Sequence, residues 1–176
     1  MLSCKNKHNI RYLVKPGFNI PAILNTMMNI EEEIKQRKFR NEYQKVAINL
    51  IYSSNWLLNR HKDFFSKLEI TQQQYNVLRI LKGQHPNAIS TSEIKIRMLD
   101  KNSDTSRIVD RLENKSLVKK NLCEHDKRLV DVSITDQGLE VLNQSDKLID
   151  ELDNIISNLT IEEAKELNLL LDKLRG

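Results

Sequence analysis

The fold is decided by residues 102–132, NSDTSRIVDRLENKSLVKKNLCEHDKRLVDV. The first half of this segment carries apolar residues at the spacing of an α-helix, namely Ile108, Val109 and Leu112. Ser103 is the predicted N-cap, because its hydroxyl can accept a hydrogen bond from an unpaired backbone N–H of the first turn. The first half is therefore predicted to form a short, capped helix.

The second half of the segment changes from a helical to a strand pattern. Residues 117–122 and 129–134 are short runs rich in β-prone side chains, and the polar residues 123–128 between them are predicted to form the loop of a hairpin. The preceding helix carries basic residues four positions apart, so that they share one face: Arg107, Arg111 and Lys115. A basic helix fits the major groove of duplex DNA, and a basic loop reaches the neighbouring backbone or minor groove.

The residues around this helix and hairpin resemble a known family. They are similar to the winged helix-turn-helix core of MarR-type bacterial transcriptional regulators over three runs: TSRIVDRLENKSLV (105–118), DKR (126–128) and VDVSITDQG (130–138). In that family the recognition helix ends in Leu-Glu-x-x-Gly-Leu-Val, the wing contains Asp-x-Arg, and a strand leads into a helix start of the form Leu-Thr-x-x-Gly. The wing pair here is Asp126 and Arg128, and the resemblance covers about residues 30–174.

One position departs from the family pattern. Ser116 stands where the family usually has glycine after the recognition helix. If that position needs a left-handed backbone, serine costs about 1 kcal/mol relative to glycine. A cost of this size is tolerable, so the departure leaves the resemblance in place.

The residues predicted to contact DNA begin with the recognition helix. Four lie near its start, and the last three of them are predicted to read base edges: Ser103, Thr105, Ser106 and Arg107. Arg111 and Lys115 are predicted to meet bases or phosphates, and the alternative for Arg111 is an ion pair with Asp110 or Glu113. A further set precedes a short helix and is predicted to donate hydrogen bonds to phosphate: Ser90, Thr91 and Ser92.

The predicted wing supplies the remaining DNA contacts. Asp126 is predicted to orient Arg128 through a charge-assisted hydrogen bond, so that the guanidinium enters the minor groove. Non-specific attraction to phosphates is assigned to three lysines: Lys119, Lys120 and Lys127.

The composition predicts a mostly α-helical chain, to which the strand pattern described above adds a small β-hairpin wing. Of the 176 residues, 39% are hydrophobic and 30% charged, with only four glycines and three prolines. Residues 1–82 carry 14 Lys and Arg against 6 Asp and Glu, whereas residues 136–176 carry 4 against 10. This asymmetry favours one basic working surface and a separate acidic end, although solvated helix faces alone could produce it. No apolar run approaches the ~18–20 residues of a membrane span.

The chain is predicted to hold one domain behind a flexible extension. Residues 1–28 are assigned to the extension because prolines and a glycine interrupt them, and native translation is hypothesised to start at Met27 or Met28. The resemblance implies that residues 29–176 form a MarR-like domain. Its winged helix lobe spans residues 71–135, and its helical dimerisation region spans residues 29–68 and 136–176.

Capping patterns and apolar spacing predict the other helices. Residues 30–68 form one long helix or two with a bend. Capping residues are predicted to begin three later helices: Thr71 with Gln74, Thr135, and Thr160 with Glu163. The helix after Thr135 is predicted to continue to Leu159, and Ile89 is a predicted strand contact. The long terminal helices carry more leucine and isoleucine than one small lobe can bury, which predicts a homodimer.

No catalytic motif is present, and neither an enzyme activity nor a cofactor is predicted. Cys123, His125 and Asp126 include metal-ligand residue types but lack a second ligand pair, and Cys123 beside basic residues is a candidate redox thiol. An ordinary wing residue is the favoured interpretation of Cys123. Two cysteines provide no disulfide framework, so a cytoplasmic location is predicted.

The predicted function is sequence-specific binding of palindromic double-stranded DNA by a homodimeric regulator. The resemblance implies a repressor or ligand-tuned switch with a small-molecule pocket between the dimer helices and the DNA-binding lobes. The sequence does not identify residues of that pocket or its ligand. The alternative is a winged-helix module that binds another protein and has no specific DNA site.

Overall fold

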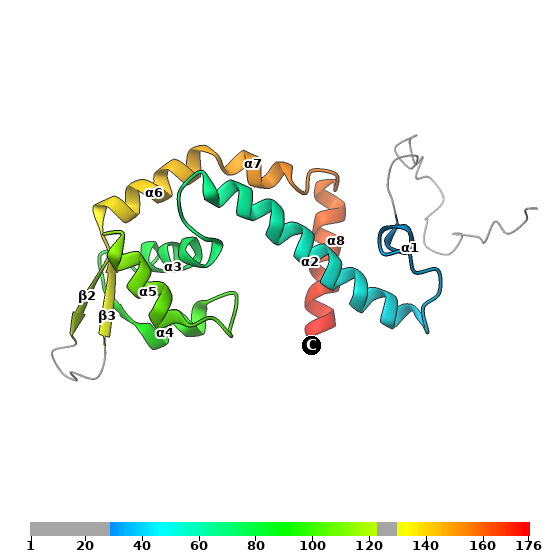
Figure 1. Cartoon of the computed structure of the whole chain (residues 1–176), viewed down its shortest axis with the longest axis horizontal. Coiled ribbons are helices and arrows are strands. Elements are labelled where there is room, and N and C mark those ends of the chain that lie inside the picture. Colours follow the sequence, from blue (N-terminus) through cyan, green and yellow to red (C-terminus); the bar gives the residue numbers. More distant parts are fainter. Residues whose placement is uncertain (1–28, 123–129) are drawn as a thin grey trace, which may run out of the picture. The chain divides into compact units, whose positions relative to one another are not determined.

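The computed structural model describes residues 29–122 and 130–176, and the predictions that concern residues 1–28 and 123–129 lie outside it. The described chain is mostly helical and contains one small antiparallel sheet (Figure 1), which confirms the predicted fold class. The chain divides into two compact units, with the boundary between Leu50 and Ile51.

The first unit contains helix α1 (Ile30–Glu33) and the start of helix α2 (Glu42–Ser66). Asn29 caps α1: its side chain accepts from the backbone N–H of Glu32 at 3.0 Å, and the Glu32 carboxylate accepts from the backbone N–H of Asn29 at 3.2 Å. Lys35 has a φ of +53°, through which a right-handed helix does not continue. The structure therefore has two helices here, the second of the two predicted alternatives.

The second unit holds the remaining helices and the sheet. After α2 its elements are α3 (Gln72–Lys82), β1 (Ile89–Ser90), α4 (Thr91–Arg97), α5 (Thr105–Asn114), β2 (Val118–Leu122), β3 (Val130–Ile134), α6 (Asp136–Lys147), α7 (Ile149–Asn154) and α8 (Ile161–Arg175). The strand order is β1-β3-β2, and both pairings are antiparallel. Val132 lies opposite Ile89 of β1 on one side and Lys120 of β2 on the other. The predicted strand pair and the predicted strand contact at Ile89 are both confirmed.

Helix α3 lies at the centre of the core of this unit. It contacts α4, α5, α6 and β3, and its side chains Val77 and Leu78 are completely buried. The surrounding elements contribute further fully buried apolar side chains: Ile94, Met98, Val109, Leu112, Val132 and Leu142. Because the apolar positions of each helix lie on one side, the opposite side of α5 remains at the surface.

Predicted capping residues begin three helices of the second unit. The hydroxyls of Thr71 and Thr160 accept from the backbone N–H three residues on, at 3.1 and 3.2 Å. The Thr135 hydroxyl accepts from the backbone N–H of Gly138 at 3.1 Å. These three predictions are confirmed. A cap depends on residues three positions apart, so the sequence alone specifies it.

The predicted N-cap of α5 is wrong by one residue. The carboxylate of Asp104, not the hydroxyl of Ser103, accepts from the backbone N–H of Arg107 at 3.1 Å. The Ser103 hydroxyl instead donates to Asp100 at 2.8 Å. A carboxylate interacts more favourably than a hydroxyl with the positive end of a helix, so Asp104 begins the helix and Ser103 closes the turn before it.

The long helix predicted from Leu139 to Leu159 is interrupted. Helix α6 ends at Lys147, α7 ends at Asn154, and Leu148 between them has a φ of −109° and a ψ of 7°. The buried Ser145 hydroxyl donates to the Leu142 carbonyl at 2.7 Å, and the Leu148 N–H donates to the Ser145 carbonyl three residues back. A serine that bonds to the backbone of the preceding turn competes with the regular ladder, which explains the interruption.

The end of α5 has the left-handed position that the family pattern implies. Ser116 has a φ of +59°. The Leu117 N–H donates to the Leu112 carbonyl at 3.0 Å, and the Ser116 N–H donates to the Glu113 carbonyl at 2.8 Å. These two bonds form a Schellman motif, which usually places glycine at the position that Ser116 occupies.

Replacing Ser116 with glycine is expected to stabilise the protein by about 1 kcal/mol, because glycine adopts a positive φ without the steric cost of a Cβ. The midpoint of urea-induced unfolding measures the change. Ser106→Gly is the matched control, since Ser106 lies inside α5 and glycine there should lower the midpoint. A lower midpoint for Ser116→Gly would contradict the expected result.

Gly138 lies where α6 approaches the end of the hairpin. The backbone N–H of Thr135 donates to the carbonyl of Leu117 at 3.2 Å, which draws the start of α6 against the segment that follows α5. A Cβ at Gly138 would overlap the Leu117 carbonyl oxygen and would come within 2.8 Å of Cγ1 of Ile134. The close approach therefore requires glycine at this position.

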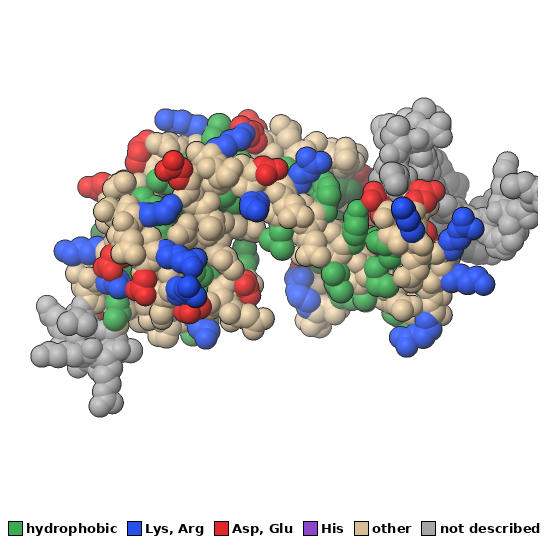
Figure 2. Space-filling view, in the orientation of Figure 1, with side chains coloured by type: hydrophobic (Ala, Val, Ile, Leu, Met, Phe, Trp, Pro, Cys, Tyr) green, Lys and Arg blue, Asp and Glu red, His purple; other side chains and the backbone are tan. Residues whose placement is uncertain are grey.

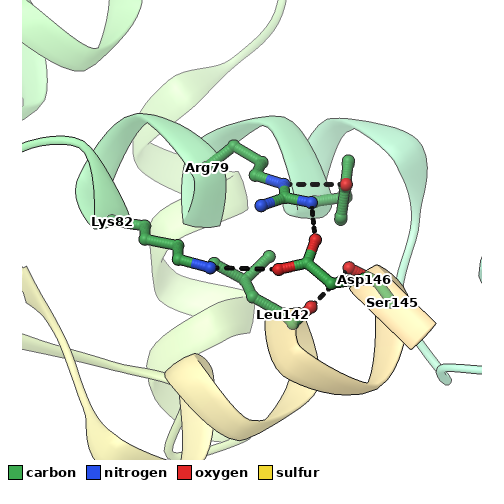
Figure 3. A network of polar contacts seen from close by, with 6 residues as sticks. Arg79, Lys82, Leu142, Ser145 and Asp146 are labelled. Atoms are coloured by element: carbon green, nitrogen blue, oxygen red, sulfur yellow. Dashed lines mark hydrogen bonds and ion pairs between the residues drawn. The ribbon is translucent and has the colours of Figure 1, made fainter. Parts of the chain in front are cut away.

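An ion-pair network joins α3 to α6 (Figure 3). The Asp146 carboxylate accepts hydrogen bonds from the guanidinium of Arg79 and from Nζ of Lys82, the latter at 3.1 Å. Nε of Arg79 also donates to the Tyr75 hydroxyl at 2.8 Å. The hydrogen bond from Arg79 holds the pKa of Asp146 below its usual value. All three charged side chains are partly exposed, so the network orients the two helices more than it stabilises them.

Helix α8 buries none of its residues in this chain. Its large apolar side chains are exposed: Ile161, Leu167, Leu169, Leu170 and Leu174. Further exposed apolar side chains occur along α2, and Figure 2 shows that hydrophobic side chains reach the surface of the chain. No helix in residues 29–122 or 130–176 is long and apolar enough to span a membrane.

Candidate nucleic-acid interface

Helix α5 presents a polar face that is fixed by the packing of its opposite side. Ile108, Val109 and Leu112 are buried, and the helix packs on α3, α4 and β2. The exposed side of α5 carries Ser106, Arg107, Asp110 and Arg111. Figure 2 shows Lys and Arg side chains at the surface in this region, with acidic side chains among them.

Arg107 and Arg111 are the exposed cations of this face. They are four residues apart, so they lie on one side of the helix. Within the described part of the chain, no carboxylate lies within ion-pairing distance of either guanidinium. The alternative pairing of Arg111 with Asp110 or Glu113 is therefore not found, and both arginines are available for an external anion.

Lys115, the third basic residue of the predicted face, is held at the end of the helix. Its Nζ donates to the backbone carbonyl of Glu69, in the connection between α2 and α3. The side chain is exposed, but its ammonium already has an acceptor within the protein. The Lys115 ammonium is thus bonded within the protein, whereas the guanidiniums of Arg107 and Arg111 have no ion-pair partner among the described residues.

Lys120 is paired with acidic side chains of α5. Its Nζ lies 2.8 Å from Oδ1 of Asp110 and 2.7 Å from Oε2 of Glu113. The backbone N–H of Lys120 also donates to Oε1 of Glu113 at 3.2 Å. The hydrogen bonds to Asp110 and Glu113 raise the pKa of the Lys120 ammonium. By contrast, Lys119 is exposed and has no carboxylate partner among the residues that the structure describes.

Two residues predicted to contact DNA are buried. Ser103 is 7% exposed and its hydroxyl bonds to Asp100, while Thr105 is 4% exposed. The Thr105 hydroxyl is buried and has no hydrogen-bond partner among the described residues. The assignment of both side chains to the DNA surface is therefore wrong, because Ser103 is buried in the turn before α5 and Thr105 faces inward in its first turn. Ser106 and Arg107 are the exposed members of that group.

The serine and threonine residues before Glu93, which are predicted to donate to phosphate, differ in their exposure and in their hydrogen bonds. Ser90 is half-buried, and its hydroxyl caps α4 by accepting from the Glu93 N–H at 3.2 Å. Its Oγ also lies 2.8 Å from Oγ of Ser92, which is exposed. Thr91 is half-buried. The Ser90 hydroxyl therefore has a structural role in the cap.

The wing contacts predicted for Asp126, Lys127 and Arg128 lie outside the described residues. The candidate redox or metal residues Cys123 and His125 lie in the same segment. The strands that lead to it pair up to Leu122 and Val130. The orientation of Arg128 by Asp126 remains a prediction.

Side chains of α3 position the turn before α5, and sequence reasoning missed them. Asn76 Oδ1 accepts from the backbone N–H of Leu99 at 3.0 Å. Nε2 of Gln73 lies 3.4 Å from both Asp100 Oδ2 and Ser103 Oγ. Two amide side chains three residues apart on one helix share a face, which is the only local signal for this role.

A cavity of about 400 Å³ lies between the end of α2 and the start of α3. Its lining is mixed: α2 and the connection to α3 contribute the apolar side chains, and α3 contributes only glutamines. The lining residues are Leu58, Lys62, Phe65, Ser66, Ile70, Thr71, Gln72 and Gln73. The sequence identified no residue of a ligand pocket. In the described segments, no group of three or more His, Cys, Asp or Glu side chains is arranged to hold a metal.

The fold and the sequence both match known transcriptional regulators. The model of the MarR family matches residues 70–130. The HTH-type transcriptional regulator PecS of Dickeya dadantii (strain 3937) is 29% identical over 131 residues, covering 73% of this chain and 79% of PecS. The HTH-type transcriptional regulator MgrA of Staphylococcus aureus is 30% identical over 129 residues, covering 70% of this chain and 83% of MgrA.

A solved structure of a relative matches the chain over a comparable length. The crystal structure of a mutant MarR from E. coli complexed with operator DNA has a TM-score of 0.69 and 26% sequence identity, and the match covers 80% of this chain and all of that chain (100%). Together with the identity to MgrA over most of its length, this match confirms the resemblance read from the recognition helix and the strands. The chain belongs to the MarR family of transcriptional regulators.

Proposed function

We propose that this protein is a homodimeric repressor that binds a palindromic double-stranded DNA operator and is tuned by a small ligand. The observation that carries the proposal is the exposed face of α5, on which Arg107 and Arg111 have no ion-pair partner among the described residues. The MarR relative of known structure is complexed with operator DNA, and it shares this fold.

In the proposed complex, α5 enters the major groove. Ser106 and Arg107 lie in its first turn, where side chains reach base edges, and Arg111 follows one turn later. Lys119 and Ser92 are exposed and suited to phosphate contacts. The sequence predicts two further contacts in the wing. Lys127 attracts phosphates without base specificity, and Arg128, oriented by Asp126, enters the minor groove.

The proposed dimer is supported by the apolar surface that one chain leaves exposed. Leu169 and Leu170 of α8 are 70% and 57% exposed, and Tyr43 of α2 is 86% exposed. Helices with this much exposed apolar surface usually pack against a partner. A second copy of the chain would cover the exposed apolar side chains of both α2 and α8. Two copies of α5 related by a two-fold axis would read two half-sites of a palindrome.

The cavity between α2 and α3 is the candidate site for the ligand, because it is concave and combines apolar side chains with polar groups. The proposal places the regulator in the cytoplasm and assigns it no enzymatic activity. The alternative, a winged-helix module for protein interaction, is less favoured because the relatives named above are transcriptional regulators.

Fluorescence anisotropy with a labelled duplex from the DNA upstream of the protein's own coding region tests the proposal. A dimer that neutralises about six phosphates should lose about 10³-fold in affinity between 50 and 200 mM salt. It should bind this duplex about 10³-fold more tightly than a shuffled duplex of equal length and composition. Equal binding to both duplexes, or binding to neither, would contradict the proposed function.

A further inference from the structure

The ammonium group of Lys120 bridges the hairpin and the recognition helix. It lies within 2.8 Å of carboxylate oxygens of both Asp110 and Glu113, and the backbone N–H of the same residue also donates to Glu113. Asp110 and Glu113 are three residues apart, so both carboxylates can reach one strand residue from a single side of α5. Lys120 thus holds three interactions with the helix.

These carboxylates lie close to the face that α5 would present to DNA. Asp110 follows Arg107 by three residues, directly precedes Arg111, and has a side chain that is 58% exposed. A carboxylate at the surface of a docked helix lies well within a Debye length of the phosphates, so it repels them. Two unpaired carboxylates would offset much of the attraction that Arg107 and Arg111 provide.

We propose that Lys120 strengthens DNA binding by neutralising Asp110 and Glu113 and by holding α5 against β2, rather than by contacting phosphate. The inference rests on the proposed function, since it requires α5 to meet DNA. It changes the role that the sequence assigns to Lys120. Lys119 keeps the phosphate-contacting role, because it is exposed and has no carboxylate partner among the described residues. Lys120 is therefore a positioning residue.

A double-mutant cycle in the full chain tests this role, with anisotropy on the upstream duplex as the readout. Lys120→Ala should weaken binding about tenfold in the wild-type background, because two carboxylates lose their counter-charge. In the Asp110→Asn/Glu113→Gln background, Lys120→Ala should change the affinity by less than about threefold. Asp110→Asn alone provides a second background if the double variant does not fold, as judged by its thermal unfolding.

Lys119→Ala is the matched control, one residue away in the same strand. It should weaken binding equally in both backgrounds. It should also lower the slope of log affinity against log salt by about 0.9 for each phosphate that the variant no longer neutralises. A residue with a merely structural role would not be rescued by removing the carboxylates. Lys120→Ala should leave the slope unchanged in the carboxylate-free background.

Equal losses for Lys120→Ala in both backgrounds, with the slope falling as for Lys119→Ala, would overturn the inference and assign Lys120 to phosphate. The titration of the unmodified protein separates this result from failure of the proposed function. If the unmodified protein does not bind the duplex, the proposed function fails and the inference with it. If it binds and the cycle is additive, only the inference fails.

Discussion

Replacing Gly138 with alanine is expected to destabilise the protein by about 3 kcal/mol, the upper end of the usual cost of overpacking. The new Cβ would overlap the backbone carbonyl oxygen of Leu117 and press on the side chain of Ile134. A backbone atom cannot move aside as a side chain does. Relief therefore requires the start of α6 to shift away from the hairpin, which would weaken the bond between Thr135 and Leu117. The midpoint of urea-induced unfolding measures the loss.

Gly83→Ala is the matched control for this substitution. Gly83 has a φ of −67° at the end of α3, and a Cβ there would meet the carbonyl oxygens of Ile80 and Arg79 at 3.5 and 3.7 Å, which are ordinary contact distances. Alanine at this position should change stability by no more than about 1 kcal/mol and should tend to stabilise, since it restricts the unfolded chain. Equal midpoints for both variants would show that the junction at Gly138 tolerates a side chain.

Replacing Arg107 and Arg111 together with alanine is expected to weaken binding to the upstream duplex by about 100-fold or more. Each arginine is an exposed cation on the face of α5, and a side chain that pairs with a base edge contributes about 1–3 kcal/mol. Because the two side chains are exposed, the fold should be retained. Anisotropy with the upstream and shuffled duplexes measures both the affinity and the ratio between them. That ratio should fall if the arginines read bases.

Lys147→Ala/Lys165→Ala removes the same charge from exposed positions on α6 and α8 and serves as the control. This variant should lose little affinity, because charge outside the proposed interface is screened by salt and contributes weakly. A comparable loss in both double variants would mean that net charge, rather than the face of α5, governs binding. Retention of full affinity after loss of both arginines would contradict the assigned interface.

Features specified over a few neighbouring residues could be predicted from the sequence. Thr71, Thr135 and Thr160 cap helices where the capping patterns indicate, and the apolar positions of α5 are buried as their spacing indicates. The left-handed backbone at Ser116 also follows from the family pattern. A cap, a Schellman motif and an amphipathic period each depend on residues within one or two turns, so no knowledge of the remaining fold is needed.

Features that depend on a second element could not be predicted in this way. Ser103 and Asp104 can both cap a helix, and the hydrogen bond of Ser103 to Asp100, supported by Gln73 of α3, leaves the cap to Asp104. The sequence predicts that Thr105 is an exposed residue of the first turn, but its side chain is buried in the packed structure. The break at Leu148 depends on the buried hydroxyl of Ser145.

Residue spacing along the chain specifies the helical and strand periods, most helix starts, the family and the position of the basic helix, because each is encoded locally. The tertiary structure decides instead which basic side chains already have a partner within the protein. In the folded chain, Lys120 pairs with Asp110 and Glu113, and Lys115 donates to the Glu69 carbonyl. Arg107 and Arg111 remain exposed. The physical reason is that charge interactions depend on distance in space. The partner of a lysine in β2 is therefore set by how the hairpin folds against α5.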